Sequence, residues 1–261
     1  MPRFVEGSRT MKAPISLQLY TLREACKTDF RAVLKEVADI GFVGVEPAGY
    51  YGLPPAEFGK IVRDLGLVIS SAHGGFPTGS QTEAVLDEHE QLGNTFIISG
   101  FGRNGLNTEE DVRKAAALIA EGAENAAKRG MRVGLHNHEF EFLKRFNGRT
   151  AYSLLTELSG PAAFNQLDVY WAQTAGEDPA AIIRENPARF PLLHIKDGPC
   201  VMGEPMTALG QGEVDVPAVL EAATAVEWHV IELDACATDM MEAVRESYRY
   251  MVENGYSTGR K

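Results

Sequence analysis

Two hydrophobic periods alternate along this chain. Short apolar runs indicate strands, and longer segments with apolar residues three and four positions apart indicate helices. Each expected strand is followed by an expected helix. The expected strands are 15–20, 43–46, 67–72, 95–99, 132–136, 164–167, 192–195 and 229–233.

Start and stop signals support the helical segments. Glycines at 41, 66 and 93 follow the last periodic residue of three of them, where a helix commonly ends. Thr108, with Asp111 three residues later, is typical of a helix N-terminus. The expected helices are 29–40, 54–66, 82–92, 108–130, 151–158, a segment after 178–179, 216–225 and 239–252.

Repeated strand–helix units with short links predict an α/β fold, a (β/α)₈ TIM barrel in a single domain over 14–261. The length of 261 residues suits such a barrel, for which roughly 250 residues is typical. A doubly wound open sheet is the alternative. It would normally have fewer strands, and no Gly-x-Gly-x-x-Gly follows the first expected strand.

The charge of the chain narrows the class of partner. The formal net charge is −11, whereas phosphate binding needs clustered Lys and Arg, so we expect no nucleic acid partner. No apolar run reaches the length of a membrane span. The oligomeric state stays open, a homo-oligomer included.

The N-terminus and the cysteines indicate the compartment. Residues 1–13 are polar and mixed, which predicts a loose N-terminal extension without the apolar stretch of a signal peptide. Cys26, Cys200 and Cys236 are scattered and odd in number, as expected of free thiols in a reducing compartment. We therefore expect a cytoplasmic protein.

Four ionisable residues lie at or just past the ends of four successive expected strands: Glu141, Asp168, His194 and Glu232. In a parallel barrel the carboxyl ends of the strands meet at one mouth, where active sites are built. Three carboxylates and one imidazole that converge there would form an oxygen-rich site for a divalent metal ion, and they favour Mn²⁺ or Mg²⁺ over a soft metal.

The same segments resemble a known family. HNHEFEF at 136–142, QLDVYW at 166–171, HIKD at 194–197 and IELD at 231–234 are similar to segments of the xylose isomerase-like TIM barrel superfamily, the sugar phosphate isomerases/epimerases. QLYTLR at 18–23 and VEPAGYYG at 45–52 are similar too. The resemblance implies metal ligands at Glu141, Asp168, His194 and Glu232, a small carbohydrate or keto-sugar substrate, and Mn²⁺, with Mg²⁺, Co²⁺ or Zn²⁺ as alternatives.

The predicted function is isomerisation or epimerisation of a sugar by proton transfer next to a carbonyl through a metal-bound enediolate. Glu141 and Glu232 would flank one carbon, one taking the proton and the other returning it. A lyase or dehydratase acting on a keto sugar or inosose with the same groups is the alternative, and a non-catalytic sugar-binding protein is a weaker one. Asp168 lacks the His three residues later that some epimerases of the superfamily carry, which favours oxidised carbohydrates as substrates.

Other residues at the expected strand ends are candidates for substrate binding, each with a structural alternative. His73 could bind a hydroxyl, and His138 could bind substrate while His136 orients a neighbour. Glu46 could contact substrate or form a structural ion pair. Lys196 could bind a carboxylate or phosphate, act as an acid, or pair with a nearby carboxylate. The Trp171 ring, beside Tyr170, could form a wall for a sugar face. His89 is expected on a helix surface and His229 at a strand start, without a role.

Overall fold

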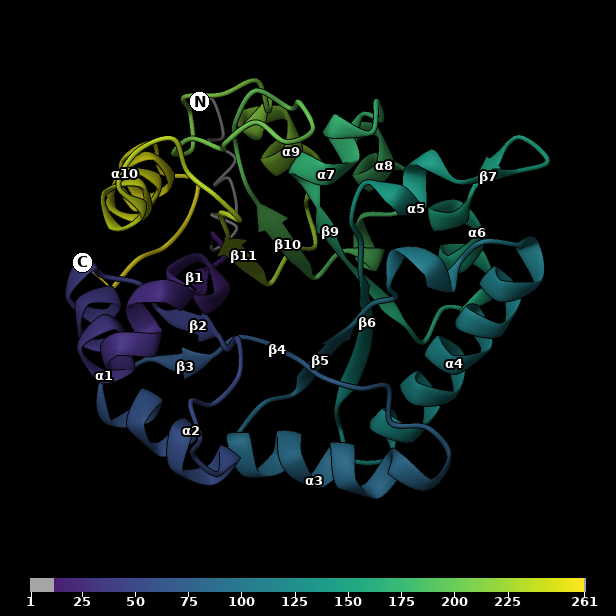
Figure 1. Ribbon diagram of the computed structural model, residues 1–261, viewed down its shortest axis with the longest axis horizontal. Coiled ribbons are helices and arrows are strands. Elements are labelled where there is room, and N and C mark those ends of the chain that lie inside the picture. The colour runs from purple at the N-terminus through teal and green to yellow at the C-terminus, as the bar shows by residue number, and fades with distance from the viewer. Residues whose placement is uncertain (1–11, 261) are drawn as a thin grey trace, which may run out of the picture.

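The strands form one parallel sheet that curls into a nearly closed barrel (Figure 1). The computed structural model describes residues 12–260, so almost all of the predicted extension, residues 1–13, lies outside the described residues. The strand order is β3-β2-β1-β11-β10-β9-β6-β5-β4. The strands are β1 Ile15–Gln18, β2 Gly44–Glu46, β3 Val68–Ile69, β4 Ala72–His73, β5 Phe96–Ser99, β6 Arg132–His136, β9 Phe164–Asp168, β10 Leu192–Ile195 and β11 Trp228–Ile231.

The two edges of this sheet, β3 and β4, are halves of one predicted strand. Val68–Ile69 pairs with β2, and Ala72–His73 pairs with β5. The buried residues Ser70 and Ser71 interrupt the strand between them. The broken strand thus stands where the ring closes, and the barrel has the eight strand positions that the sequence predicts. The predicted TIM barrel is confirmed.

Helices cover the outside of the barrel, as the ring around the strands in Figure 1 shows. The outer helices are α1 Arg23–Ile40, α2 Pro55–Asp64, α3 Thr82–Leu92, α4 Glu109–Ala127, α6 Ala151–Leu158, α8 Pro179–Glu185, α9 Val216–Ala222 and α10 Met240–Glu253. Thr108 and Asp111 form a reciprocal capping box at the start of α4, as their spacing predicts. Within residues 12–260, no helix has the length and apolar composition to cross a membrane.

Several short elements lie in the loops that lead away from the strand ends, two short α-helices and a hairpin among them. These three are α5 Phe140–Leu143, α7 Val169–Thr174 and the antiparallel hairpin of β7 Arg145–Phe146 with β8 Arg149–Thr150. The α7 helix begins directly after β9, and the carboxylate of Asp168 caps it by accepting a hydrogen bond from the Trp171 backbone N–H at 3.0 Å. The sequence pattern did not predict these elements because each is too short to show a period.

Alternation along the strands divides the barrel interior into an apolar end and a polar mouth. Successive side chains of a strand point to opposite faces, so Phe164, Gln166 and Asp168 of β9 share the inner face. Phe164 packs with Phe96, Ile98 and Leu192 in an apolar cluster. A Cβ at Gly134 would lie 2.2 Å from the Phe164 ring, so this position of β6 must lack a side chain. Further along the same faces, polar groups replace the apolar ones.

Candidate active site

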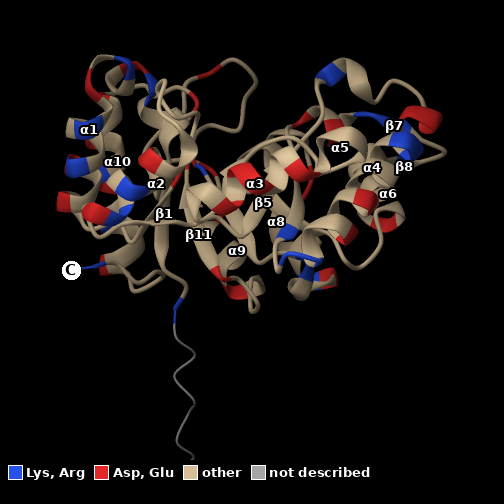
Figure 2. Ribbon diagram, turned by 90° about the horizontal axis from the view of Figure 1, so that it is seen from below, with Lys and Arg blue, Asp and Glu red and all other residues tan. Residues whose placement is uncertain are grey.

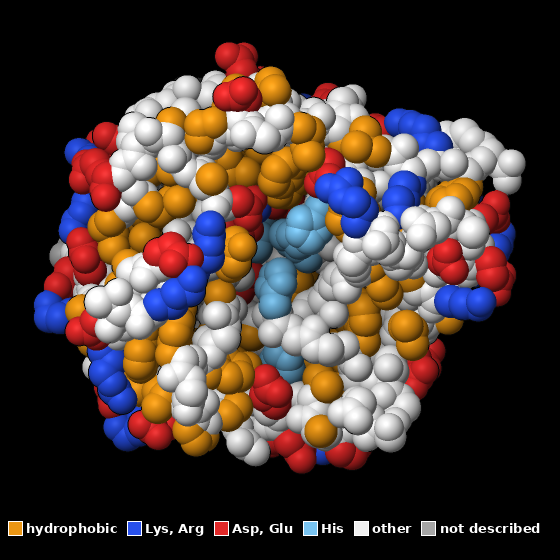
Figure 3. All heavy atoms as spheres, viewed as in Figure 1, with side chains coloured by type: hydrophobic (Ala, Val, Ile, Leu, Met, Phe, Trp, Pro, Cys, Tyr) orange, Lys and Arg blue, Asp and Glu red, His pale blue; other side chains and the backbone are white. Residues whose placement is uncertain are grey.

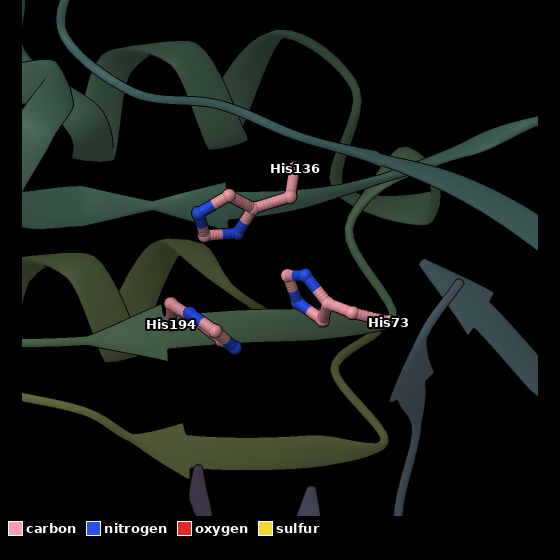
Figure 4. Close-up of side chains that lie close together, drawn as sticks. All are labelled: His73, His136 and His194. Atoms are coloured by element: carbon pink, nitrogen blue, oxygen red, sulfur yellow. The ribbon is translucent and has the colours of Figure 1, made fainter. Parts of the chain in front are cut away.

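Four buried side chains meet at the polar mouth of the barrel. One potential ligand atom from each of His136, Asp168, His194 and Glu232 lies within 4.8 Å of the others. A second such group joins His73 to His136 and His194. Figure 4 shows the three rings close together, with 4.7 Å between the ring centroids of His136 and His194. We call the first group the N₂O₂ cluster, because it offers two imidazoles and two carboxylates.

Three of the four predicted metal ligands belong to this cluster, and His136 stands where we expected Glu141. Glu141 belongs to neither group of potential ligands among the described residues. It lies on α5, where one carboxylate oxygen, Oε2, accepts a hydrogen bond from the His138 backbone N–H at 2.9 Å. The other oxygen is buried without a hydrogen bond. Burial raises the pKa of Glu141 to about 8, so the buried carboxyl group is largely protonated at neutral pH.

The alternation of β6 explains this difference. His136 is the last residue of the strand, and its side chain shares the inner face with Gly134. Glu141 comes five residues later, after the chain has left the sheet and entered α5. Asp168 and His194 are likewise inward-facing strand residues. Choosing the inward residue at each strand end, rather than the next carboxylate along the chain, would have selected His136 from the sequence.

Lys196 lies against the carboxylates of the cluster. Its Nζ lies 2.9 Å from Asp168 Oδ2, 2.7 Å from Glu232 Oε2 and 2.7 Å from Asp234 Oδ2, and its side chain is buried. Burial alone would lower the pKa of Lys196, but the three carboxylates outweigh it and raise this pKa well above its usual range. Lys196 is therefore a fixed positive charge, already engaged by protein carboxylates.

Glu46 lies behind the histidines rather than on the cavity surface. It is fully buried, and its Oε1 lies 2.9 Å from His194 Nε2 and 2.9 Å from His73 Nε2. Burial alone would raise its pKa, but His194 and His73 hold the pKa of Glu46 well below the usual range. Glu46 thus forms the structural ion pair that was one of its two expected roles, and it is not among the residues that line the cavity, where it would contact a substrate.

A cavity of about 620 Å³ opens over the cluster. Figure 3 shows histidine side chains in the hollow at the centre of this face, with acidic side chains beside them. His73, His136, His138, Lys196, Glu232 and Asp234 supply polar groups to its wall, and Tyr20 and Phe101 supply aromatic rings. Trp171 is not part of this wall; its ring centroid lies 5.8 Å from Lys196 Nζ.

The histidines of the site differ in protonation. Burial alone would lower the pKa of His194, but Glu46 and Glu232 outweigh it and raise this pKa to about 10. Burial, with the neighbouring His194, lowers the pKa of His136 well below its usual range. Burial also lowers the pKa of His138, whose Nδ1 is buried without a hydrogen-bond partner. At neutral pH His194 is thus an imidazolium, beside the neutral imidazoles of His136 and His138.

The donor set of the N₂O₂ cluster fits a divalent cation. Asp168 Oδ2 is buried and makes no hydrogen bond, although Lys196 Nζ is nearby, so an acceptor remains for an ion. Two imidazoles with two carboxylates are ligands that Zn²⁺, Mn²⁺ and Co²⁺ share. The four side chains come from three neighbouring strands and the residue after β11, which gives the cluster a rigid frame.

The sequence model of the xylose isomerase-like TIM barrel matches residues 34–253. The chain belongs to this family. The match spans the segments that carry His73, the N₂O₂ cluster and Lys196. The comparison with curated proteins gave no match.

Several solved structures share the fold of this chain at low sequence identity. A sugar phosphate isomerase/epimerase from Parabacteroides distasonis is 23% identical, with a TM-score of 0.81 over 99% of this chain and 100% of that one. The IOLI protein with a bound zinc atom is 12% identical, with a TM-score of 0.72 over 94% and 100%. A probable 3-DHS dehydratase, AsbF, from Bacillus anthracis is 15% identical, with a TM-score of 0.70 over 92% and 98%.

The charge distribution outside the mouth is mixed. Figure 2 shows Lys and Arg interspersed with Asp and Glu along the outer helices, with no basic stripe in that view. Many of these charges pair locally, as Arg129 does with Glu83, Asp87 and Glu90. The concentration of buried charge at the barrel mouth therefore stands apart from the ordinary surface of the chain.

Proposed function

We propose that the protein is a metal-dependent sugar isomerase or epimerase that moves a proton next to a carbonyl. The observation that carries this proposal is the N₂O₂ cluster under a cavity whose wall holds further acid–base groups. The family, and the isomerase/epimerase among its structural neighbours, support the reaction class.

His136, Asp168, His194 and Glu232 would hold the cation. The prediction that Glu141 is a ligand stays open, but its separation from the cluster makes His136 our preferred fourth ligand. Mn²⁺ remains the expected metal, and the second imidazole makes Zn²⁺ and Co²⁺ stronger alternatives than the sequence indicated. When bound, such an ion polarises a carbonyl oxygen and favours loss of a proton from the neighbouring carbon.

Glu232 is the proposed base. It lines the cavity, and its Oε2 lies 2.8 Å from His194 Nδ1 and 2.7 Å from Lys196 Nζ. Burial alone would raise its pKa, but Lys196 and His194 hold the pKa of Glu232 well below the usual range, so the carboxylate is ionised. The fixed charge of Lys196 would favour negative charge on an oxygen of the substrate nearby.

A second proton-transfer group is needed for inversion. Glu141, the partner that the sequence assigned to Glu232, is not part of the cavity wall. His138 is part of it, and its neutral imidazole can accept or donate a proton. We therefore propose two candidates for the second group, His138 and Glu141, and the experiment below distinguishes between them.

The cavity wall also bears on the substrate. Among the residues that form it, all within the described part of the chain, Lys196 is the single Lys or Arg, and three carboxylates already hold it. We propose an unphosphorylated keto sugar, because a phosphate group would find no free cationic side chain on this wall.

Deuterium exchange at carbon tests the proposal. Metal-loaded protein is incubated in D₂O with a panel of keto sugars, and ¹H NMR follows loss of the C–H signal beside the carbonyl. Glu232→Gln is expected to lower the exchange rate by about 10²–10⁴-fold, the usual contribution of one acid–base group. The metal content of Glu232→Gln, Glu141→Gln and His138→Gln is measured first, because Glu232 is also a proposed ligand, and the exchange rates of metal-loaded variants are then compared. Glu124→Gln, an exposed carboxylate on α4, is the matched control.

The products separate the rival functions. Inversion or carbonyl transfer supports the isomerase or epimerase, whereas loss of a substituent supports a lyase, the reaction class of the dehydratase neighbour. Binding of a keto sugar to metal-loaded wild-type protein without any exchange over the whole panel would indicate a binding protein and overturn the proposal.

A further inference from the structure

Two buried residues behind the N₂O₂ cluster connect its two imidazoles. We propose that Glu46 and Gln166 are positioning residues that fix the tautomers of His194 and His136, so that His194 presents Nδ1 and His136 presents Nε2 to a metal ion. This inference rests on the metal site of the proposed function. It assigns a purpose to Glu46 and Gln166, neither of which lines the cavity.

The first step concerns His194. Its Nε2 lies 2.9 Å from Glu46 Oε1, and its Nδ1 points the other way, 2.8 Å from Glu232 Oε2. A carboxylate oxygen without a proton can only accept a hydrogen bond, so Nε2 donates to Glu46 and, without a metal ion, Nδ1 donates to Glu232. Glu232 belongs to the N₂O₂ cluster and Glu46 does not, so a metal ion held by Glu232 would replace the proton on Nδ1. A neutral imidazole has one N–H and one lone pair. In the form that can bind a metal ion, the lone pair of His194 therefore lies on Nδ1, beside Glu232.

The second step passes through Gln166. Its amide nitrogen, Nε2, lies 2.6 Å from Glu46 Oε2 and donates to it, since the carboxylate cannot donate in return. This contact fixes which end of the amide faces the histidines. The carbonyl oxygen, Oε1, then lies 3.1 Å from His136 Nδ1 and accepts the proton that this nitrogen carries. The lone pair of His136 therefore lies on Nε2.

Glu46 can dictate both tautomers because its own position is fixed from several strands. Gln18, its partner in the β1–β2 register, donates from Nε2 to Oε1 at 2.5 Å, and the Ser71 hydroxyl donates to Oε2. His73 Nε2 adds a contact at 2.9 Å. Both carboxylate oxygens are thus engaged, and the residue is fully buried. Hydrogen-bonded partners of this kind commonly orient metal-binding histidines and raise metal affinity.

Zn²⁺-loaded wild-type protein, with ¹⁵N in its histidines, gives a direct test. Two-dimensional ¹H–¹⁵N long-range correlation spectra show which ring nitrogen carries a proton and which binds the metal. We expect a proton on Nε2 and Zn²⁺ on Nδ1 of His194, and a proton on Nδ1 and Zn²⁺ on Nε2 of His136. The reverse pattern in either ring would overturn the inference and leave the metal site standing. Failure of the wild-type protein to bind Zn²⁺ would overturn the proposed metal site and the inference together.

Substitutions test the energetic consequence. Glu46→Gln and Gln166→Ala are expected to weaken Zn²⁺ binding by about 10–100-fold, the usual effect of removing such a partner, as measured by calorimetry. Asn165→Ala is the matched control. Asn165 is a buried amide on the same strand whose Nδ2 donates instead to Tyr152 and Thr156, so its loss should lower stability without moving Zn²⁺ affinity. Equal affinity of the Gln166→Ala variant and wild-type protein would refute the positioning role of Gln166.

Discussion

Replacing Glu141 with glutamine is expected to make the metal-free protein increasingly stable, relative to wild-type protein, as the pH rises. The carboxyl group of Glu141 is fully buried, one of its oxygens has no hydrogen bond, and burial raises its pKa to about 8 from the ordinary 4.5. In the unfolded chain the group releases its proton near pH 4.5, whereas the folded protein holds it until about pH 8. The folded state therefore binds more protons in this window, and the stability that the group contributes below pH 4.5 is lost as the pH rises to 8.

The size of this loss follows from the pKa difference. Each pH unit between the two pKa values is equivalent to about 1.4 kcal/mol, so a gap of about 3.5 units gives about 5 kcal/mol. Glutamine keeps the oxygen that accepts from the His138 backbone N–H and has no charge to bury. The free energy of unfolding of Glu141→Gln minus that of wild-type protein should thus increase by about 4 kcal/mol between pH 5 and pH 8.

Urea unfolding in EDTA at several pH values between 5 and 8 measures this difference. The other titrating groups are common to both proteins and cancel in the subtraction. Glu124→Gln, on the exposed face of α4, should show a difference that does not change with pH. A flat difference for Glu141→Gln as well would mean that Glu141 is ionised in the folded protein. The reasoning from burial would then be refuted, and the role of Glu141 as a metal ligand would gain support.

Two further predictions follow from the cluster and its lysine. His136 belongs to the N₂O₂ cluster and His138 does not, so His136→Ala should lose bound metal, measured by elemental analysis. His138→Ala should keep its metal and lose substrate affinity or turnover. Metal loss from His138→Ala alone would reverse these roles. Lys196→Met should destabilise the metal-free protein by about 3–5 kcal/mol, because it leaves buried carboxylates without their cation. Mn²⁺ should restore part of this stability, measured by thermal unfolding. An unchanged unfolding temperature without metal would contradict the pairing.

The fold could be predicted because its signal repeats. Most strands coincide with a short apolar run and most outer helices with a helical period, and the glycines and the Thr108 cap mark several helix ends. The departures are local. The helix predicted at 29–40 begins earlier, at Arg23, with non-helical backbone angles at Asp29. The helix predicted at 216–225 ends at Ala222. Short loop elements such as α7 lie below the length at which periodicity can be recognised.

The site could be predicted less well, because sequence position does not show where a side chain points. Asp168, His194 and Glu232 lie together as the strand-end rule suggests. That rule selected His136 as well as Glu141, and the resemblance to the superfamily placed the fourth ligand at Glu141, whereas the structure brings His136 to the other three. Burial was also misjudged for His89, expected on a helix surface. It is buried, with its Nδ1 2.8 Å from Asn94 Nδ2, in a contact between residues on either side of a turn.

The buried charges at the mouth make a proton and a metal ion alternatives at His194. Without a metal ion, Glu46 and Glu232 raise the pKa of His194 to about 10 although burial alone would lower it, so both ring nitrogens carry protons. A cation held by Asp168 and Glu232 would need the Nδ1 lone pair, and its binding must therefore release the proton that now faces Glu232 at 2.8 Å. The Nε2 proton faces Glu46, outside the cluster, and can stay. Lys196 keeps its charge throughout. Replacement of one proton by a divalent ion at Nδ1 would therefore add positive charge where a substrate oxygen would gain negative charge.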